Sequence, residues 1–335
     1  MSVQEKQKQK RRQKRRQKRR QKERENEEKN EEKNEEKNET EVRPRQESAV
    51  REPRVTDEYG RRIRAWELVL RYLLLLVVLA LTVGPFLWQL STSLKGPTED
   101  IFSSPPTFLP SHPTLHNYQR VTDTIPVWDY ALNSLKVAGA SVVTNCVGSA
   151  LAGYALARLR YRGRGVTTLL FVLAMLVPVE GIVIAQFTTM RELGLNNTLI
   201  GVLLPGSVGA MNVLLMRNAF RNLPYEIEEA AYIDGANVWQ RFRLIALPAV
   251  KGTLAVVAIF AFMGAWDDFL WPLIVLSDPS RFTLTIGLNY LHGTFANDER
   301  LVAAGTVIAV APLIALFACL QRYFFRGVGE GAVKG

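Results

Sequence analysis

The chain has 335 residues, a formal net charge of +10 and 47% hydrophobic residues. These averages combine two segments of opposite character, because residues 1–60 contain almost no large apolar side chains whereas apolar runs of membrane-spanning length recur after Trp66. The composition excludes a single soluble globular domain, and it divides the chain into a charged tail, residues 1–60, and a transmembrane domain, residues 61–335.

The tail consists of short charged repeats. RRQK occurs three times from Arg11 to Lys22, and EEKN occurs three times from Glu27 to Asn38. Neighbouring Glu and Lys favour transient helix, but without an apolar stripe the tail has nothing to pack against. We expect a solvated, disordered cytoplasmic tail with no specific nucleic-acid partner. Binding of its basic block to anionic lipid headgroups or to nucleic acid is the alternative.

Six segments meet or approach the length of about 20 apolar residues with which a helix crosses a bilayer core of about 30 Å. In chain order, the predicted spans are residues 72–94, 137–157, 166–190, 195–216, 252–277 and 301–320. Helices of this length that are apolar on all faces are rare in soluble proteins. The sequence therefore predicts an all-α integral membrane protein with six transmembrane helices.

Lys and Arg collect in alternate connections between these segments. They are concentrated before the first span, between the second and third, between the fourth and fifth, and after the sixth; examples are Arg71, Arg164, Arg241 and Arg326. Connections rich in Lys and Arg stay in the cytoplasm. We therefore expect both termini to be cytoplasmic, in a bacterial or archaeal cytoplasmic membrane.

Cysteine and histidine predict neither disulfides nor a metal site. Cys146 and Cys319 lie within apolar runs, so a disulfide framework is not expected. His112, His116 and His292 lie in polar connections without Cys or carboxylate partners at ligand spacing. We expect these histidines to be surface residues and the chain to bind no metal.

Between the fourth and fifth spans, residues 224–248 interrupt the apolar sequence with a charged segment. Pro224 is suited to open a helix, Asp234-Gly235 is a strong helix stop, and a second short helix is predicted over about residues 237–244. Leu247-Pro248 then leads into the fifth span, where proline is tolerated in the first turn. The result is a cytoplasmic helix, turn and helix. It is either a docking site for another protein or an amphipathic segment on the membrane surface.

The pattern of this segment resembles the EAA loop of the permease subunits of bacterial ABC importers at every signature position. These positions are Glu229, Ala230, Ala231, Gly235, Ile245, Leu247 and Pro248. Neighbouring residues, including Asp234 and the stretch WDDFLWPL at 266–273, resemble the carbohydrate branch and its subunit type exemplified by the second maltose permease. The resemblance covers about residues 65–335 and implies a MetI-like permease fold.

This resemblance implies a transport subunit of an ATP-driven, binding-protein-dependent importer of a sugar or oligosaccharide. The implied partners are a second permease subunit, an ABC ATPase dimer, an extracytoplasmic sugar-binding protein and membrane lipid. Residues Glu229 to Gly235 would contact the ATPase and transmit its closure to the spans. No G-x-x-x-x-G-K-[ST] phosphate loop occurs in the sequence. The chain is therefore not expected to be an enzyme or to bind a cofactor, and ATP and Mg would bind at the partner ATPase.

Polar residues within the apolar segments are candidates for the translocation pathway. A charge at the centre of a helix in lipid costs about 2.5–3.5 kcal/mol, so such residues usually face protein or water. The candidates are Glu180, Gln186, Asn212, Trp266, Asp267 and Asp268. The aromatic faces of Trp266 and Trp271 would suit stacking on a sugar. The alternative is that these groups bridge helices or lie at the membrane interface.

Three other functions stay open at this point. The same machine could import a polyol, glycerol phosphate or another small polar solute, although a phosphate would favour cationic pathway groups, which the candidates lack. An ATP-independent channel or carrier is a second alternative, but it has no use for an ATPase docking site. The third is a membrane anchor whose basic tail recruits nucleic acid or lipid.

Overall fold

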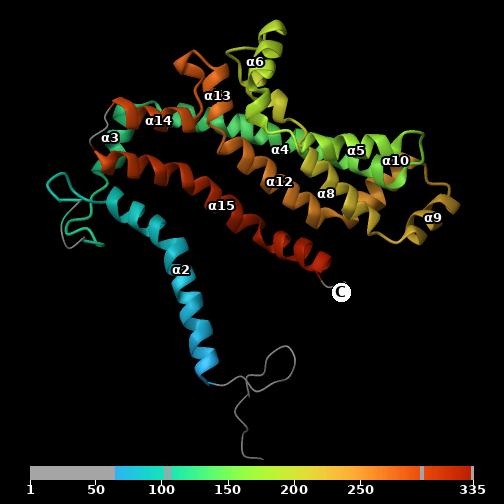
Figure 1. The fold of residues 1–335 in the computed structure, drawn as a ribbon, viewed down its shortest axis with the longest axis horizontal. Helices are drawn as coiled ribbons and strands as arrows, with labels where there is room; N and C mark the ends of the chain where they lie inside the picture. The colour runs from blue at the N-terminus through green and yellow to red at the C-terminus, as the bar shows by residue number, and fades with distance from the viewer. Residues whose placement is uncertain (1–64, 102, 104–106, 295–297, 333–335) are drawn as a thin grey trace, which may run out of the picture. The chain divides into compact units, whose positions relative to one another are not determined.

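The structure is a computed structural model that describes residues 65–101, 103, 107–294 and 298–332. The charged tail predicted for residues 1–60 lies outside the described residues. The secondary structure of the described residues is entirely helical (Figure 1). The chain divides into two compact units, residues 1–76 and 77–335, and all the contacts discussed below lie within the second.

The helices follow one another in the order shown in Figure 1. The elements of the first half are α2 (Ala65–Ser93), α3 (His116–Thr124), α4 (Val127–Arg158), α5 (Arg164–Ala174), the 3-10 helix η1 (Val179–Ile182), α6 (Val183–Glu192), α7 (Leu199–Leu203), the 3-10 helix η2 (Leu204–Gly206) and α8 (Ala210–Arg221). The elements of the second half are α9 (Tyr225–Ile233), α10 (Val238–Gln240), the π-helix η3 (Arg241–Ala246), α11 (Leu247–Ala249), α12 (Lys251–Trp266), α13 (Leu270–Val275), the 3-10 helix η4 (Pro279–Arg281), α14 (Leu284–Thr294) and α15 (Glu299–Ala332).

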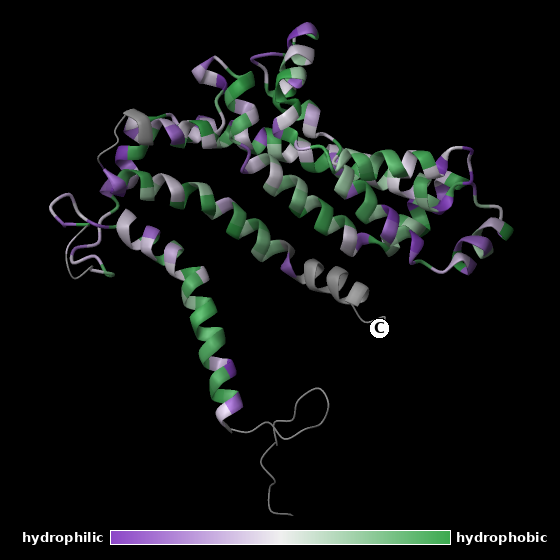
Figure 2. Cartoon of the chain, in the orientation of Figure 1, coloured by the Kyte–Doolittle hydropathy of each residue, from purple (hydrophilic) through white to green (hydrophobic). Residues whose placement is uncertain are grey.

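Three helices are long and apolar enough to cross a membrane, over Trp66–Ser93, Val127–Arg158 and Glu299–Cys319. Three further candidates are helix pairs bent at a short break: α5 with η1 and α6 by 96°, α7 and η2 with α8 by 46°, and α10 to α11 with α12 by 79°. The described part of the chain thus contains three such helices, or up to six spans if each bent pair counts as one. Figure 2 shows that hydrophobic residues dominate most of these helices.

The predicted span 166–190 is broken rather than continuous. α5 ends at Ala174, and Pro178 precedes the 3-10 turn from which α6 begins. Proline disfavours helical backbone in the residue before it, so the helix stops ahead of Pro178. Glu180 therefore lies in a bend of 96° and not in the middle of a straight helix.

The boundaries of the other predicted spans also differ, and the span predicted at 195–216 is bent by 46° between η2 and α8. The span predicted at 137–157 begins at Val127, because polar residues such as Asn133 and Ser134 belong to α4 although they lie outside the apolar window. The span predicted at 252–277 stops at Trp266, and α13 is a separate short helix. The carboxylate of Asp268 accepts a hydrogen bond from the backbone N–H of Trp271 at 3.4 Å, a local bond that competes with continuation of the helix.

α4 is the element around which the others pack, with its most extensive contacts to α8 and α12. Its first half contributes Tyr130 and Val137 to one hydrophobic core, together with residues of α3, α14 and α15. Its second half contributes Tyr154 and Ala157 to another core, formed with α8, η3 and α12. Gly153 permits the close approach of α4 and α8, since a Cβ atom there would lie 2.7 Å from Cβ of Met216.

Candidate coupling site and translocation groups

The first part of the candidate coupling site is α9, which projects a mostly exposed surface. Pro224 sets the extended conformation before the helix, and Glu226 and Glu228 occupy the first turn, where negative charge is favoured. Only two of its nine residues are buried, Glu228 and Ala231. A helix that buries so little is held by few contacts.

A positive-φ glycine ends α9. The φ angle of Gly235 is +84°, a conformation that side-chain-bearing residues rarely adopt. The N–H of Gly235 donates to the carbonyl of Tyr232 at 3.0 Å, and the N–H of Ala236 donates to the carbonyl of Ala231 at 2.9 Å. This pair of bonds is the Schellman arrangement of a helix C-terminus. The stop predicted at Asp234-Gly235 is confirmed.

The second helix of the site begins where a side chain caps it. Asn237 accepts the N–H of Gln240 at 2.9 Å, and the Gln240 side chain accepts the N–H of Asn237 at 2.8 Å, which completes a capping box. The helix then continues through η3 and α11 to Ala249, five residues beyond the predicted end at residue 244. We call residues 224–249 the elbow.

Leu247 and Pro248 lie at the end of this helix. The sequence predicts them instead in the first turn of the fifth span. The chain bends by 79° between α11 and α12. In an α-helix the ring of Pro248 would clash with the carbonyl of Leu244. The π-helical turn over Arg241–Ala246 widens the backbone just ahead of the proline, which offers a physical reason for this irregularity.

The signature residues of the EAA pattern differ in exposure. The side chains of Glu229, Ala230, Asp234, Gly235 and Pro248 belong to exposed residues, Ile245 and Leu247 are half-buried, and Ala231 is buried. Large apolar side chains accompany the exposed set: Ile233 is 82% exposed and Leu244 is 68% exposed. The elbow therefore presents both acidic and apolar groups on its surface.

A buried ion pair under α9 was not found by sequence reasoning. Nε of Arg158 lies 3.1 Å from Oε1 of Glu228, and the two side chains are 2% and 9% exposed. The hydroxyl of Tyr154 donates to Oε2 of Glu228 at 3.0 Å. The Nε and Oε1 atoms are close without the alignment of a hydrogen bond, so their contact is an ion pair. Sequence reasoning did not bring Glu228 and Arg158 together, because the two residues lie in distant segments of the chain.

Among the candidate pathway residues, Asn212 lies in a polar network between α4 and α8. It is buried, and its amide donates to Oδ1 of Asn145 at 2.9 Å. Asn145 also accepts the N–H of Gly209 at 2.8 Å and donates to the carbonyl of Gly206 at 3.0 Å. These contacts bridge α4 to the break between η2 and α8, and Asn212 has its partner within the chain.

The tryptophans of the stretch 266–273 are buried. Trp266 is 4% exposed, donates through Nε1 to the carbonyl of Ala309 at 3.0 Å, and stacks on Phe262 with ring centroids 5.5 Å apart. Trp271 donates to the carbonyl of Gly201 at 3.2 Å. In this conformation both rings join helices to one another and offer no free face to a solute.

The remaining candidates are accessible. Glu180 and Asp267 are exposed, and Gln186 and Asp268 are half-buried. Within the described residues, the side chains of Glu180, Gln186 and Asp267 have no hydrogen-bond or ion-pair partner, whereas Asp268 accepts the bond from Trp271 described above. Within the described residues, no side-chain hydrogen bond or ion pair joins one of the six candidates to another.

At the start of α15, a second set of charges connects three segments. Asp298 bonds to Arg120 of α3 and to Arg300, whose Nε lies 3.0 Å from Oδ1. Arg300 also donates to the carbonyls of Gly96 at 2.7 Å and Glu99 at 3.0 Å. Burial raises the pKa of the Asp298 carboxyl, but the hydrogen bonds from Arg120 and Arg300 outweigh burial and hold the pKa below its ordinary value.

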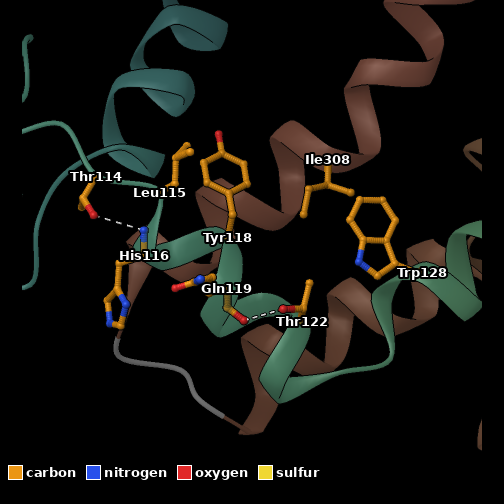
Figure 3. Close-up of a pocket in the computed structure, with 8 residues that line it drawn as sticks. All are labelled: Thr114, Leu115, His116, Tyr118, Gln119, Thr122, Trp128 and Ile308. Atoms are coloured by element: carbon orange, nitrogen blue, oxygen red, sulfur yellow. Dashed lines mark hydrogen bonds between the residues drawn. The ribbon is translucent and has the colours of Figure 1, made fainter.

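A groove of about 750 Å³ lies close to this charged set, between α3, the first turn of α4 and α15 (Figure 3). Its lining residues are Thr114, Leu115, His116, Tyr118, Gln119, Thr122, Trp128 and Ile308. Figure 3 shows Trp128 beside Ile308, and the imidazole of His116 pointing away from Tyr118 and Trp128. Across the described residues, no group of three His, Cys, Asp or Glu side chains gathers that could hold a metal ion.

The apolar helices and bent helix pairs define an all-helical, multi-pass membrane protein. The family described as the inner membrane component of binding-protein-dependent transport systems matches residues 146–330, more than half of the chain. The chain belongs to this family. It is a permease subunit of an ABC transporter in the inner membrane and is not itself an enzyme.

Two relatives and one solved structure illustrate the similarity. The permease protein AraQ of the arabinooligosaccharide transport system of Halalkalibacterium halodurans is 36% identical over 68% of this chain and 82% of its own. The permease protein DasC of the diacetylchitobiose uptake system of Streptomyces coelicolor is 31% identical over 76% of this chain and 92% of its own. A chain of a bacterial ABC transporter that imports the acidic polysaccharide alginate is 26% identical, with a TM-score of 0.67 over 76% of this chain and 95% of its own.

These findings confirm the family to which the EAA pattern points. The alternatives of an ATP-independent channel or carrier and of a membrane anchor are wrong, because members of this family are components of binding-protein-dependent transport systems.

Proposed function

We propose that this permease subunit serves an importer of a sugar or oligosaccharide and that its elbow is the docking site of the ABC ATPase. The exposed surface of α9 carries the docking proposal. Glu229, Ala230 and Ile233 are exposed on a helix that ends at the positive-φ Gly235. Exposed apolar groups flanked by charge are typical of a protein contact surface.

In this proposal the chain has six spans and both termini in the cytoplasm, so that the elbow faces the ATPase. The complete importer contains a second permease subunit, an ABC ATPase dimer that binds ATP and Mg, and an extracytoplasmic sugar-binding protein. The elbow contacts are made by Glu229, Ala230, Ala231, Asp234 and Gly235, while Ile245, Leu247 and Pro248 set its exit. Coupling requires that the elbow bind two conformations of the ATPase with different affinities.

Three similar proteins support a sugar as the solute. Two are named as permeases of arabinooligosaccharide and diacetylchitobiose systems, and the third belongs to an alginate importer. The alternative is a polyol, glycerol phosphate or another small polar solute. A phosphate group favours arginine or lysine in its path, and none of the candidate pathway groups is cationic. We retain Glu180, Gln186 and Asp267 as candidates for contact with the solute, because their side chains have no partner within the described residues.

Docking is tested by Glu229→Lys and by Gly235→Asp. The first reverses an exposed charge, and the second places a side chain on a backbone with φ of +84°. We expect the amount of ATPase that copurifies with the permease pair to fall by about tenfold, which corresponds to about 1.4 kcal/mol. Glu192→Lys, at another exposed acid at the end of α6, is the matched control and should leave ATPase binding unchanged. Normal ATPase binding by both elbow variants would refute the docking proposal.

The solute is tested separately with the complex reconstituted in proteoliposomes. The binding protein encoded beside the permease is loaded in turn with arabino-, galacto- or chito-oligosaccharides, glycerol, sorbitol or glycerol 3-phosphate, and ATP hydrolysis is measured. Stimulation by an oligosaccharide supports the proposed cargo. Stimulation by glycerol, sorbitol or glycerol 3-phosphate alone selects the alternative.

The orientation is tested by cysteine labelling. With both native cysteines replaced by alanine, Ile233→Cys should react with a membrane-impermeant maleimide only in inside-out vesicles. Reaction in right-side-out vesicles would contradict a cytoplasmic elbow.

A further inference from the structure

The middle of α9 is attached to the membrane helices chiefly through Glu228. α9 buries only Glu228 and Ala231, and the methyl group of an alanine offers little contact area. The Glu228 carboxylate contacts two side chains of α4, Arg158 at 3.1 Å and Tyr154 at 3.0 Å. The buried part of this attachment is therefore centred on one charged contact, while the exposed Tyr232 ring lies 5.4 Å from the guanidinium of Arg241 in η3.

Arg158 is placed to hold the start of α9 as well as its middle. It is the last residue of α4, where a positive charge is favoured by the helix dipole. Its Nη2 donates to the carbonyl of Leu223 at 2.6 Å, and its guanidinium lies 4.2 Å from the ring centre of Tyr225. One planar side chain thus contacts the connection before the helix, the first residue of the helix and Glu228.

Tyr154 extends this contact into a closely packed core. Its ring lies 5.4 Å from Phe220 of α8 and 5.1 Å from Phe242 of η3, measured between ring centroids. All three rings are buried. Because closely packed side chains transmit displacement instead of absorbing it, a movement at Glu228 reaches α4, α8 and the second helix of the elbow together.

We propose that Arg158, Glu228 and Tyr154, here called the Arg158 joint, pass the movement of α9 to α4 and α8. The proposal rests on the proposed function, since it requires that the ATPase move the elbow. The three side chains act as positioning residues. They make α9 and the cytoplasmic end of α4 one rigid body, so that closure of the ATPase displaces the membrane helices and not the elbow alone.

The alternative is that the joint only stabilises the fold. In that case its loss lowers the yield or thermal stability of the protein, but α9 and α4 keep one fixed separation in every folded complex. A measurement of that separation in two states of the ATPase distinguishes the two roles, because it does not depend on how much protein folds.

The test places spin labels at Ile227→Cys on α9 and Val143→Cys on α4, both exposed positions outside the proposed ATPase contacts, after replacement of Cys146 and Cys319 by alanine. The complete complex with its ATPase and binding protein is measured without nucleotide and with MgATP and orthovanadate, so no transported solute is needed. We expect one narrow distribution of label distances, at the same mean in both states, because α9 and α4 move together.

Glu228→Gln removes the charge of the joint and keeps the size of the side chain. We expect its distance distribution to broaden and its mean to shift on addition of MgATP and vanadate. Glu228→Asp, which keeps the charge, should recover most of the narrow distribution. Glu226→Gln removes an exposed charge from the same first turn and should behave as the unmodified chain. A distribution for Glu228→Gln that matches the unmodified chain in both states would overturn the proposal.

If Glu228→Gln does not assemble, Tyr154→Phe replaces it in the test. This change removes one hydroxyl from the joint and keeps the ring between Phe220 and Phe242. A smaller broadening with MgATP is expected, and an unchanged distribution would again overturn the joint. Failure of the docking proposal looks different: the ATPase would then still copurify with the Glu229→Lys variant.

Discussion

The two ends of α4 are attached to their neighbours in opposite ways. Near its start, Asn133 donates to the carbonyls of Ser280 and Phe282, both at 3.1 Å, and the Ser134 hydroxyl accepts the N–H of Leu284 at 2.8 Å. At its last turn, Arg158 and Tyr154 contact the Glu228 carboxylate of α9, and Arg158 also contacts the Leu223 carbonyl and the Tyr225 ring. The first attachment is neutral and spread over three backbone groups, whereas the second is centred on a buried ion pair.

This difference indicates which end is fixed and which end can move. Neutral hydrogen bonds to several backbone groups hold η4 and α14 in one register on α4, and any sliding would leave buried groups unpaired. α9 buries two residues and ends at exposed turns, so it has little local stability of its own. If the proposed joint holds, such an element moves together with the last turn of α4, while the start of α4 serves as a scaffold.

The largest effect on stability is expected from breaking the fixed end. Asn133→Ala with Ser134→Ala leaves two carbonyls and one N–H without their side-chain partners, and each unpaired buried group costs about 1–3 kcal/mol. The midpoint of thermal unfolding in detergent should fall by several degrees. Asn218→Ala, an exposed amide on α8, is the control and should change unfolding little.

The comparison also predicts that the two kinds of damage separate. The double variant at the fixed end should lose stability, whereas Glu229→Lys in the elbow should lose ATPase binding at an unchanged unfolding midpoint. An equal loss of stability in both variants would contradict the distinction between a scaffold end and a mobile end.

A smaller effect is expected at the middle of α4. Asn145→Ala removes the acceptor of Gly209 and Asn212 and the donor to Gly206 at the break before α8. Side-chain hydrogen bonds within membranes are worth about 0.6–2 kcal/mol, so the unfolding midpoint should fall by less than in the double variant.

Asn212→Ala sharpens the result for this network, because it removes one bond and keeps the other two. It should lower the midpoint less than Asn145→Ala and leave solute transport intact. Loss of transport without loss of stability would instead return Asn212 to the translocation pathway.

The start and end of the helices in the elbow could be predicted from residues that are near one another in the sequence. Pro224 before the first helix and glycine at position 235 each act through their own backbone preferences, and the structure has a helix start and a positive φ at these positions. The capping box at Asn237 and Gln240 belongs to the same local class of signal and defines the start of the second helix. Such features depend on residues that are near one another in the chain.

The Arg158 joint and the buried position of Trp266 did not follow from the sequence, because both depend on contacts between distant segments. Glu228 and Arg158 meet only when α9 folds under the end of α4, and no spacing rule links them. The sequence left Trp266 either to stack on a sugar or to bridge helices, and its buried indole N–H donates to the carbonyl of Ala309 on α15. Tertiary packing decided both roles.

The smallest expected effect concerns pH at the start of α15, far along the chain from the elbow. The pKa of Asp298 is lowered in the folded protein, so the fold stabilises its ionised form. The resulting stability is present above the ordinary pKa of about 3.9 for an aspartate, and it is lost as the pH falls from about 5 through the lowered value.

Asp298→Asn removes this titration while keeping a side chain that can accept hydrogen bonds from Arg120 and Arg300. The unmodified chain should be the more stable of the two near pH 7, and the difference in unfolding midpoint should shrink as the pH is lowered below about 5. Asp298 lies outside the elbow, so ATPase binding by the variant should equal that of the unmodified chain at neutral pH. A difference in midpoint that stays constant between pH 7 and pH 4 would mean that the charge of Asp298 contributes nothing, and that Arg300 holds the start of α15 through its carbonyl contacts alone.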